Sequence, residues 1–222
     1  MSGKPTRKSA EVMRPAGSDR PWPPGEMIEN AVDPLFEPSP EMVAWMRSTF
    51  INEGAALQNE DHAHLANASI GVLWTNVSNS RATRRVVGQC ETGQPAIMGK
   101  WLRERALIQI EAWFGEVPDF ILTFDAQYAA VCEDAEFCAL VEHELYHAAQ
   151  ERDIYGAPKF SREGRPKFTI QGHDVEEFVG VVRRYGAEAA GVTALVEAAN
   201  RKPEVAVASI AQACGTCMAR AA

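Results

Sequence analysis

Residues 139–147 read Ala-Leu-Val-Glu-His-Glu-Leu-Tyr-His, and this stretch decides how the chain is interpreted. On a helix His143 and His147 are one turn apart, so both imidazoles project from the same face. Two histidines in this arrangement can bind one zinc ion at about 2.0–2.1 Å. Glu144 lies about 100° around the helix from His143, beside the ion rather than on it. The stretch therefore predicts a zinc site with Glu144 as a general base.

The spacing of His143, Glu144 and His147 suits the activation of a water molecule by a metal ion. Zinc lowers the pKa of a water molecule that it binds toward about 7, and a carboxylate beside the metal can accept the proton that is released. The string H-E-x-x-H also occurs by chance, which is the alternative explanation. Here it lies in a strong helical pattern that follows a predicted strand, and small residues, Ala148 and Ala149, come after His147. These features favour a zinc site over an accident.

A catalytic zinc ion needs a third protein ligand and an open fourth position. The candidates downstream are His173, Glu176, Glu177 and Asp153. Asp153 stands six residues after His147, but Gln150 occupies the position where a glycine would let the chain turn back toward the metal. His173 follows a glycine and precedes Asp174, which can cap a helix, so it can be aimed at the first two ligands. We favour His173, while the glutamates and Asp153 stay open.

Other side chains invite weaker interpretations. Three tyrosines could donate a hydrogen bond to a developing oxyanion, namely Tyr146, Tyr155 and Tyr185, and we place Tyr185 first because it lies on the helix that follows His173. His62 and His64 could form a second metal site, although a polar loop or a packing role is the simpler expectation. Cys214 and Cys217 have the spacing of a redox pair or half a zinc ribbon, but we expect a structural or incidental role.

The composition excludes several classes of protein. The chain has 222 residues, of which 46% are hydrophobic and 23% charged, as in an average soluble domain. No apolar run reaches the length of a membrane span, and no secretory signal is visible, so we expect a cytoplasmic protein without a membrane partner. The net charge of −8 argues against a nucleic-acid binder. Weak binding through residues 1–24, which hold five basic and two acidic side chains, is the exception.

The hydrophobic pattern predicts an α+β fold in which helices pack on a small, mainly antiparallel or mixed sheet. The H-E-x-x-H motif places the active site on one of these helices, so the expected fold is similar to that of zincins. Helices are expected after the cap residue Ser39 and over residues 100–114, 134–150 and 174–185, with Asp134 and Asp174 as caps. Strands are expected over residues 68–77, 85–90, 119–124 and 167–170, with a turn at residues 78–81. We divide the chain into a disordered basic leader (1–24), a catalytic domain (25–186) and an alanine-rich helical extension (187–222) that is split at Pro203.

Several segments of the chain are familiar, namely Ala139–His147, Gly172-His-Asp-Val-Glu-Glu-Phe178 and Arg183-Arg-Tyr-Gly186, together with His62–Leu65, Val72–Thr75, Trp113–Gly115 and Pro118–Phe120. They resemble a known family, the putative phage metallopeptidase domain. The resemblance covers roughly residues 35–186. It implies a zinc peptidase that is encoded by a phage or prophage and works in a bacterial cell. The segment around His173 is also similar to the SprT-like zinc peptidases, in which a histidine that opens a helix is the third ligand. This similarity implies the same role for His173.

The first functional hypothesis is therefore a Zn²⁺-dependent endopeptidase that acts on proteins or peptides. We expect an extended peptide to add to the sheet along residues 119–124, with Glu144 first accepting a proton and then returning it to the leaving amine. The alternatives are a catalytically inactive binding module stabilised by zinc, and a zinc hydrolase of a non-protein amide such as cell-wall peptide. A closed metal site, with Glu176 or Glu177 as fourth ligand, would distinguish the binding module. The sequence leaves the oligomeric state undecided.

Overall fold

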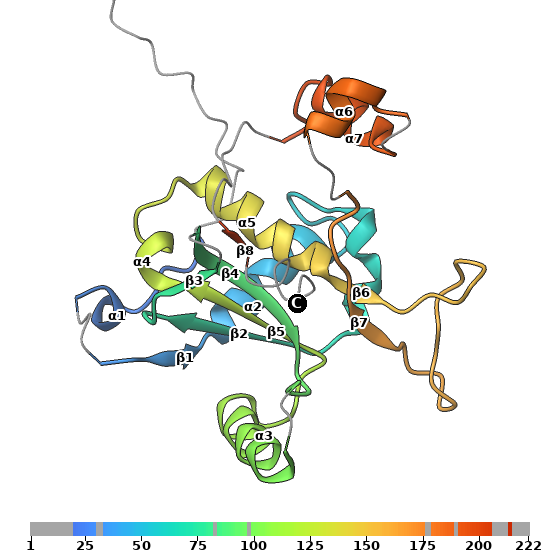
Figure 1. Ribbon diagram of the computed structural model, residues 1–222. Helices are drawn as coiled ribbons and strands as arrows, with labels where there is room; N and C mark the ends of the chain where they lie inside the picture. Colours follow the sequence, from blue (N-terminus) through green and yellow to red (C-terminus); the bar gives the residue numbers. More distant parts are fainter. Residues whose placement is uncertain are drawn as a thin grey trace, which may run out of the picture.

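The computed structural model describes residues 20–29, 33–81, 84–96, 99–175, 179–188, 191–205 and 213–214. Within them the chain forms a six-stranded mixed sheet with the order β1-β2-β5-β4-β3, in which β8 also pairs with β4 (Figure 1). Its strands are β1 (Phe36–Pro38), β2 (Ile70–Thr75), β3 (Asn79–Arg81), β4 (Arg84–Thr92), β5 (Phe120–Asp125) and β8 (Ala213–Cys214). A second sheet pairs β6 (Ala148–Gln150) with β7 (Phe168–Ile170).

The described part of the chain also contains α-helices. They are α1 (Gly25–Glu29), α2 (Pro40–Met46), α3 (Lys100–Phe114), α4 (Ala126–Ala129), α5 (Asp134–His147), α6 (Val179–Tyr185) and α7 (Thr193–Ala199). A π-helical turn, η1 (Arg47–Ile51), continues α2, and η2 (Glu60–Asn67) is a 3₁₀-helix. The predicted α+β class, with a small mixed sheet packed by helices, is confirmed.

The two faces of the sheet are covered by different helices, α3 and α5 (Figure 1). Alternate residues of a strand point to opposite faces. Phe124 of β5 belongs to the larger core together with Phe137 of α5, and their ring centroids are 5.7 Å apart. Ile121, three residues earlier, packs instead with Ile110 of α3 in a smaller cluster. The helix that carries the two motif histidines is therefore anchored to the sheet by aromatic packing.

Strand β5 lies in the middle of the sheet. It pairs in parallel with β2 and antiparallel with β4, so neighbours occupy both of its sides. Our expectation that a peptide would add along residues 119–124 is therefore wrong, because an added strand needs backbone groups without a partner strand. Strand β4 lies between β5 and β3, and β3 ends this strand order.

Helix α5 begins and ends at different residues from those predicted. Glu133, not Asp134, is its N-cap, and the backbone N–H of Glu133 donates to the carboxylate of Glu136 over 3.3 Å. The helix ends at His147, whereas the sequence predicted helix as far as Gln150. Residues 148–150 pair with β7 instead, since a strand partner from a distant part of the chain outweighs the helix propensity of alanine.

The remaining helices and strands agree with the sequence in part. Ser39 caps α2, with its hydroxyl accepting from the N–H of Met42, and α3 has the predicted bounds. The predicted turn at residues 78–81 is wrong, because residues 79–81 form β3 and the hairpin reverses between Arg81 and Arg84. In the predicted helical extension α7 is a helix, but Ala213–Cys214 is a strand that pairs with β4.

The beginning of the described chain is packed against α5. Residues 1–19 of the predicted leader lie outside the described residues. Arg20 is 4% exposed, pairs with Asp134 at 2.7 Å, and donates to the carbonyls of Ala129 and Cys132, both at 3.0 Å. Its guanidinium also lies 4.7 Å from the ring centroid of Phe137. The packed part of the chain therefore includes Arg20.

Candidate metal centre

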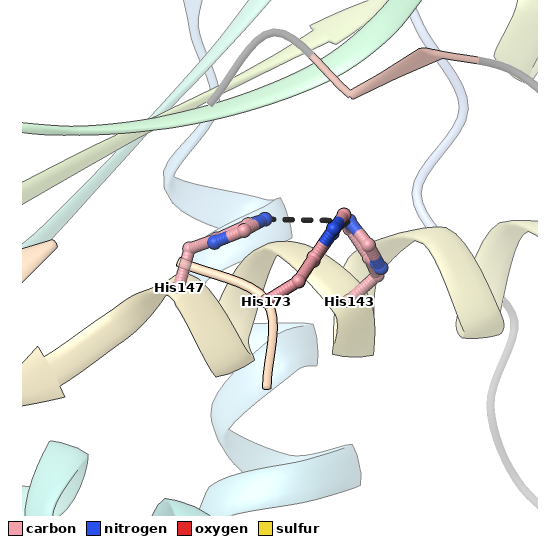
Figure 2. A group of neighbouring side chains, drawn as sticks. All are labelled: His143, His147 and His173. Carbon is pink, nitrogen blue, oxygen red and sulfur yellow. Dashed lines mark hydrogen bonds between the residues drawn. The ribbon is translucent and has the colours of Figure 1, made fainter. Parts of the chain in front are cut away.

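Helix α5 presents His143 and His147 on one face, as their spacing requires. Their Nε2 atoms are 3.3 Å apart, and their ring centroids are 5.0 Å apart (Figure 2). His147 is 2% exposed, whereas His143 is partly exposed. The pair therefore has one ring held in the interior and a second ring nearer the surface.

A third imidazole completes the group from outside the helix. His173 follows β7, and its Nε2 lies 3.3 Å from Nε2 of His143. The ligand atoms of the three histidines all lie within 4.8 Å of one another (Figure 2). Nitrogens that bind one tetrahedral zinc at about 2.05 Å stand about 3.3 Å apart, so both Nε2–Nε2 distances fit such an ion. The three side chains can therefore hold a single metal ion.

The orientation of His147 is set by the backbone that leads to His173. Nδ1 of His147 lies 2.7 Å from the carbonyl oxygen of Gln171, and the N–H of Gln171 donates to the carbonyl of His147 over 2.9 Å. A ring that donates from Nδ1 to a carbonyl keeps the Nε2 lone pair for a metal. The end of α5 and the segment before His173 thus hold each other in register.

Glu144 lies beside this group on the side of the sheet. Its side chain is fully buried. The neighbouring strand β4 has a glycine at this point, and a β-carbon placed on Gly88 would lie 2.8 Å from Oε1 of Glu144. The absence of a side chain at residue 88 is thus what leaves room for the carboxylate. Nothing in the local sequence pattern pointed to Gly88, since only the pairing of β4 with its neighbours brings it to α5.

The other predicted ligands and donors are placed elsewhere or not described. Asp153 accepts from the backbone N–H groups of Tyr155 and Ala157, so its carboxylate shapes a turn. Tyr155 itself is 87% exposed. Tyr185 ends α6, is 66% exposed, and has the Arg184 guanidinium over its ring. The structure does not bring these side chains into the group of three histidines.

Glu176 and Glu177 lie outside the described residues, so their predicted role as alternative ligands stays a prediction. The side chains of Cys214 and Cys217 are likewise not described. The other three cysteines, Cys90, Cys132 and Cys138, are buried. Burial raises the pKa of Cys138 to about 11, which keeps it protonated at neutral pH.

A polar region lies on the opposite side of α5 from Glu144. His62 is fully buried, with its ring 4.7 Å from that of Tyr146, and Nε2 of His64 lies 2.7 Å from the carbonyl of Ala148. The Tyr146 hydroxyl donates to Asp61 over 3.0 Å. These contacts connect η2 with the end of α5, so the two histidines of η2 support the helix that carries His143 and His147. A pocket of about 330 Å³ opens beside them, between η2 and the segment that contains Gln171.

Burial has a strong effect on the titration of His62. Desolvation lowers the pKa of His62 to about 4, with a further lowering by His64 and an opposing effect of Asp61. The ring is therefore neutral at physiological pH. The pKa of Tyr146 is raised, mainly by burial. Neither group is placed among the three histidines.

Comparisons with known proteins identify the family. A family model described as "Putative phage metallopeptidase" matches residues 43–200, which includes all three histidines and extends beyond the predicted domain end at residue 186. No curated protein and no solved structure matches the chain. None of the helices in the described part of the chain is long and apolar enough to cross a membrane. The matched region covers more than half of the sequence and contains the histidine group, and the chain therefore belongs to the putative phage metallopeptidase family.

Proposed function

We propose that the protein is a zinc-dependent endopeptidase in which His143, His147 and His173 hold the metal and Glu144 is the general base. The observation that carries the proposal is the pair of 3.3 Å separations between imidazole nitrogens, next to a buried carboxylate. Neutral imidazoles suit zinc well, and three protein ligands with an open position are typical of catalytic zinc sites. Membership of a metallopeptidase family supports the same assignment.

Zinc bound there would act as a Lewis acid and make an attacking water molecule acidic near neutral pH. The protein supplies the remaining functions. Glu144 is one residue from a ligand and fully buried, so its carboxylate can accept a proton from the attacking water and later return it to the leaving amine. Contact with β4 at Gly88 limits the positions that the carboxylate can take. Such positioning is what an efficient proton transfer requires.

The peptide would bind to β4 rather than to β5. Strand β4 contacts α5 and lies between β5 and the terminal strand β3. Its Gly88 packs against the proposed base, Glu144. Gly88 of β4 pairs with Phe124 of β5 and with Cys214 of β8, so an extended peptide would take the place of the two-residue strand β8 and would then pass close to Glu144 and the histidines. Backbone hydrogen bonds to β4 would then supply affinity that does not depend on the peptide's side chains.

The test compares two glutamates of the same helix. Glu144→Gln should keep zinc, measured by elemental analysis, and lose about 10²- to 10⁴-fold in kcat, because a general base contributes that much. Glu142→Gln is the matched control, since Glu142 accepts from the side chain of Asn59 on the side of η2. Both variants are assayed on a peptide library, casein and peptidoglycan fragments, which separates a peptidase from a hydrolase of cell-wall amides. Full activity in Glu144→Gln, or a wild-type chain that binds no zinc, would refute the proposal.

A further inference from the structure

Strand β8 pairs with β4 at the residue that touches Glu144. Ala213 is opposite Val86, and Cys214 is opposite Gly88, in parallel pairing. Neighbouring strands lie about 4.8 Å apart, so the backbone of Cys214 is one strand spacing from the glycine in contact with the proposed base. Figure 2 shows β8, the short reddish segment at the top, beside β4 and above the three histidines.

The position of β8 is the position where a substrate strand would add. One side of β4 is taken by β5, with Gly88 opposite Phe124. At Gly88 the other side of β4 is taken by Cys214 of β8, while Val86 pairs both with Asn79 of β3 and with Ala213 of β8. A peptide that adds to β4 at Gly88 must use the same side of the strand as β8. The peptide and β8 therefore compete for one set of backbone groups.

We infer that strand β8, Ala213–Cys214, is an intramolecular competitor that occupies the peptide-binding edge of β4 and holds the enzyme in a low-activity state. The inference rests on the proposed peptidase function. The occupant is a segment of this chain, identified by its pairing with Val86 and Gly88. The described pairing is only two residues long, so few hydrogen bonds hold it and a substrate strand can displace it.

Competition of this kind has a definite kinetic signature. Substrate binds only to the fraction of molecules in which β8 has left β4, so the apparent affinity falls by that fraction. The catalytic residues are the same once substrate is bound. Release of β8 should therefore lower KM and leave kcat unchanged.

The experiment uses the full chain with prolines in β8. The double variant Ala213→Pro/Cys214→Pro removes both backbone N–H groups of the strand. The matched control, Glu204→Pro/Val205→Pro, places two prolines in the same part of the chain, at exposed residues outside every described helix and strand. We expect KM of the β8 variant to fall about tenfold, because one or two backbone hydrogen bonds shift an equilibrium by about that factor. KM of the control should equal that of the wild type.

A synthetic peptide of residues 206–222 supplies the second arm, under reducing conditions. Added to the β8 variant, it should inhibit competitively and restore the wild-type KM. A fluorescent copy should bind the β8 variant about tenfold more tightly than the wild-type chain, in which the edge is occupied. This binding assay needs no catalytic activity, so it decides the inference even if no variant cleaves any substrate and the proposed function fails.

Three results would overturn the inference. The first is a β8 variant with the wild-type KM. The second is a β8 variant whose kcat and unfolding temperature fall together, which would make β8 a structural strand. The third is a labelled peptide that fails to bind the β8 variant at millimolar concentration.

Discussion

Gly88 and Glu144 are in such close contact that a β-carbon on residue 88 would lie 2.8 Å from the Oε1 atom of the glutamate. The same β-carbon would lie 2.9 Å from Cδ1 of Leu140, one helical turn earlier. Strand β4 and helix α5 therefore meet through a glycine at the point where the proposed base lies. A methyl group at this position would have to push the carboxylate aside.

Gly88→Ala should accordingly impair catalysis more than metal binding. Displacing a catalytic group by about 1 Å can cost on the order of 100-fold, so we expect kcat to fall by 10- to 100-fold. Zinc content should stay at the wild-type level because the three histidines are unaffected. Gly180→Ala is the control, since a β-carbon there meets only the end of Arg183 at 3.9 Å. Unchanged kcat in Gly88→Ala would show that the carboxylate has room to adjust.

His173→Ala should weaken zinc binding by at least 100-fold, because it removes one of three ligands, and even partners that only orient a ligand contribute 10- to 100-fold. The measurement is a competition titration against a chelator of known affinity. Asp153→Ala should change nothing, as its carboxylate accepts hydrogen bonds within a turn. Glu176→Ala and Glu177→Ala should also bind zinc normally. A tenfold loss in either glutamate variant would instead indicate a fourth ligand and a closed, non-catalytic site.

Arg20→Ala should destabilise the folded chain by about 2–3 kcal/mol, because the carbonyls of Ala129 and Cys132 lose a charged donor. The packing of the guanidinium against Phe137 is lost as well. Urea unfolding at pH 7 measures the change. Arg183→Ala is an exposed control on α6 that should stay within about 0.5 kcal/mol of the wild type. A loss of less than 1 kcal/mol in Arg20→Ala would mean that these contacts contribute little.

His62 should make the protein less stable in mild acid. Its pKa falls from 6.5 in the unfolded chain to about 4 in the folded one, so the unfolded state binds the proton more tightly between these values. The contribution of this group to the free energy of unfolding is fully present above pH 6.5. It decreases as the pH falls toward 4, by up to about 3 kcal/mol. Urea unfolding at several pH values should show a steeper loss in the wild type than in His62→Phe. Equal slopes for the two proteins would contradict the expectation.

The sequence predicted those features that depend on short-range geometry. The shared face of His143 and His147 follows from helical spacing alone, and the structure also brings His173 to them. The relation between Gly88 and Glu144 could not be predicted, because it depends on the pairing of strands that lie far apart in the sequence. The hydrogen bond between His147 and the carbonyl of Gln171 could not be predicted either, because every residue has a backbone carbonyl. Strand β6 was predicted as helix because two alanines favour helix, and only the pairing with β7 reverses that preference.

Arg20 illustrates a further limit of sequence reading. It lies in a segment rich in proline and poor in large apolar residues, which is the composition of a solvated tail. The structure nevertheless buries it at the start of α5, where carbonyls of the preceding turn accept its hydrogen bonds. Such a site is assembled from backbone groups, so local composition does not reveal it.

The short sheet of β6 and β7 makes the position of His147 relative to His173 independent of the number of residues between them. Ala148 is paired with Ile170, so the second and third histidines are brought together at the base of a hairpin-like excursion. The excursion itself carries exposed residues such as Ile154, which is 90% exposed. Residues can be inserted or deleted beyond the paired base without moving His147 relative to His173. Searches for relatives should therefore allow any number of residues between these two histidines, because a pattern with fixed spacing would miss homologues that have the same metal geometry.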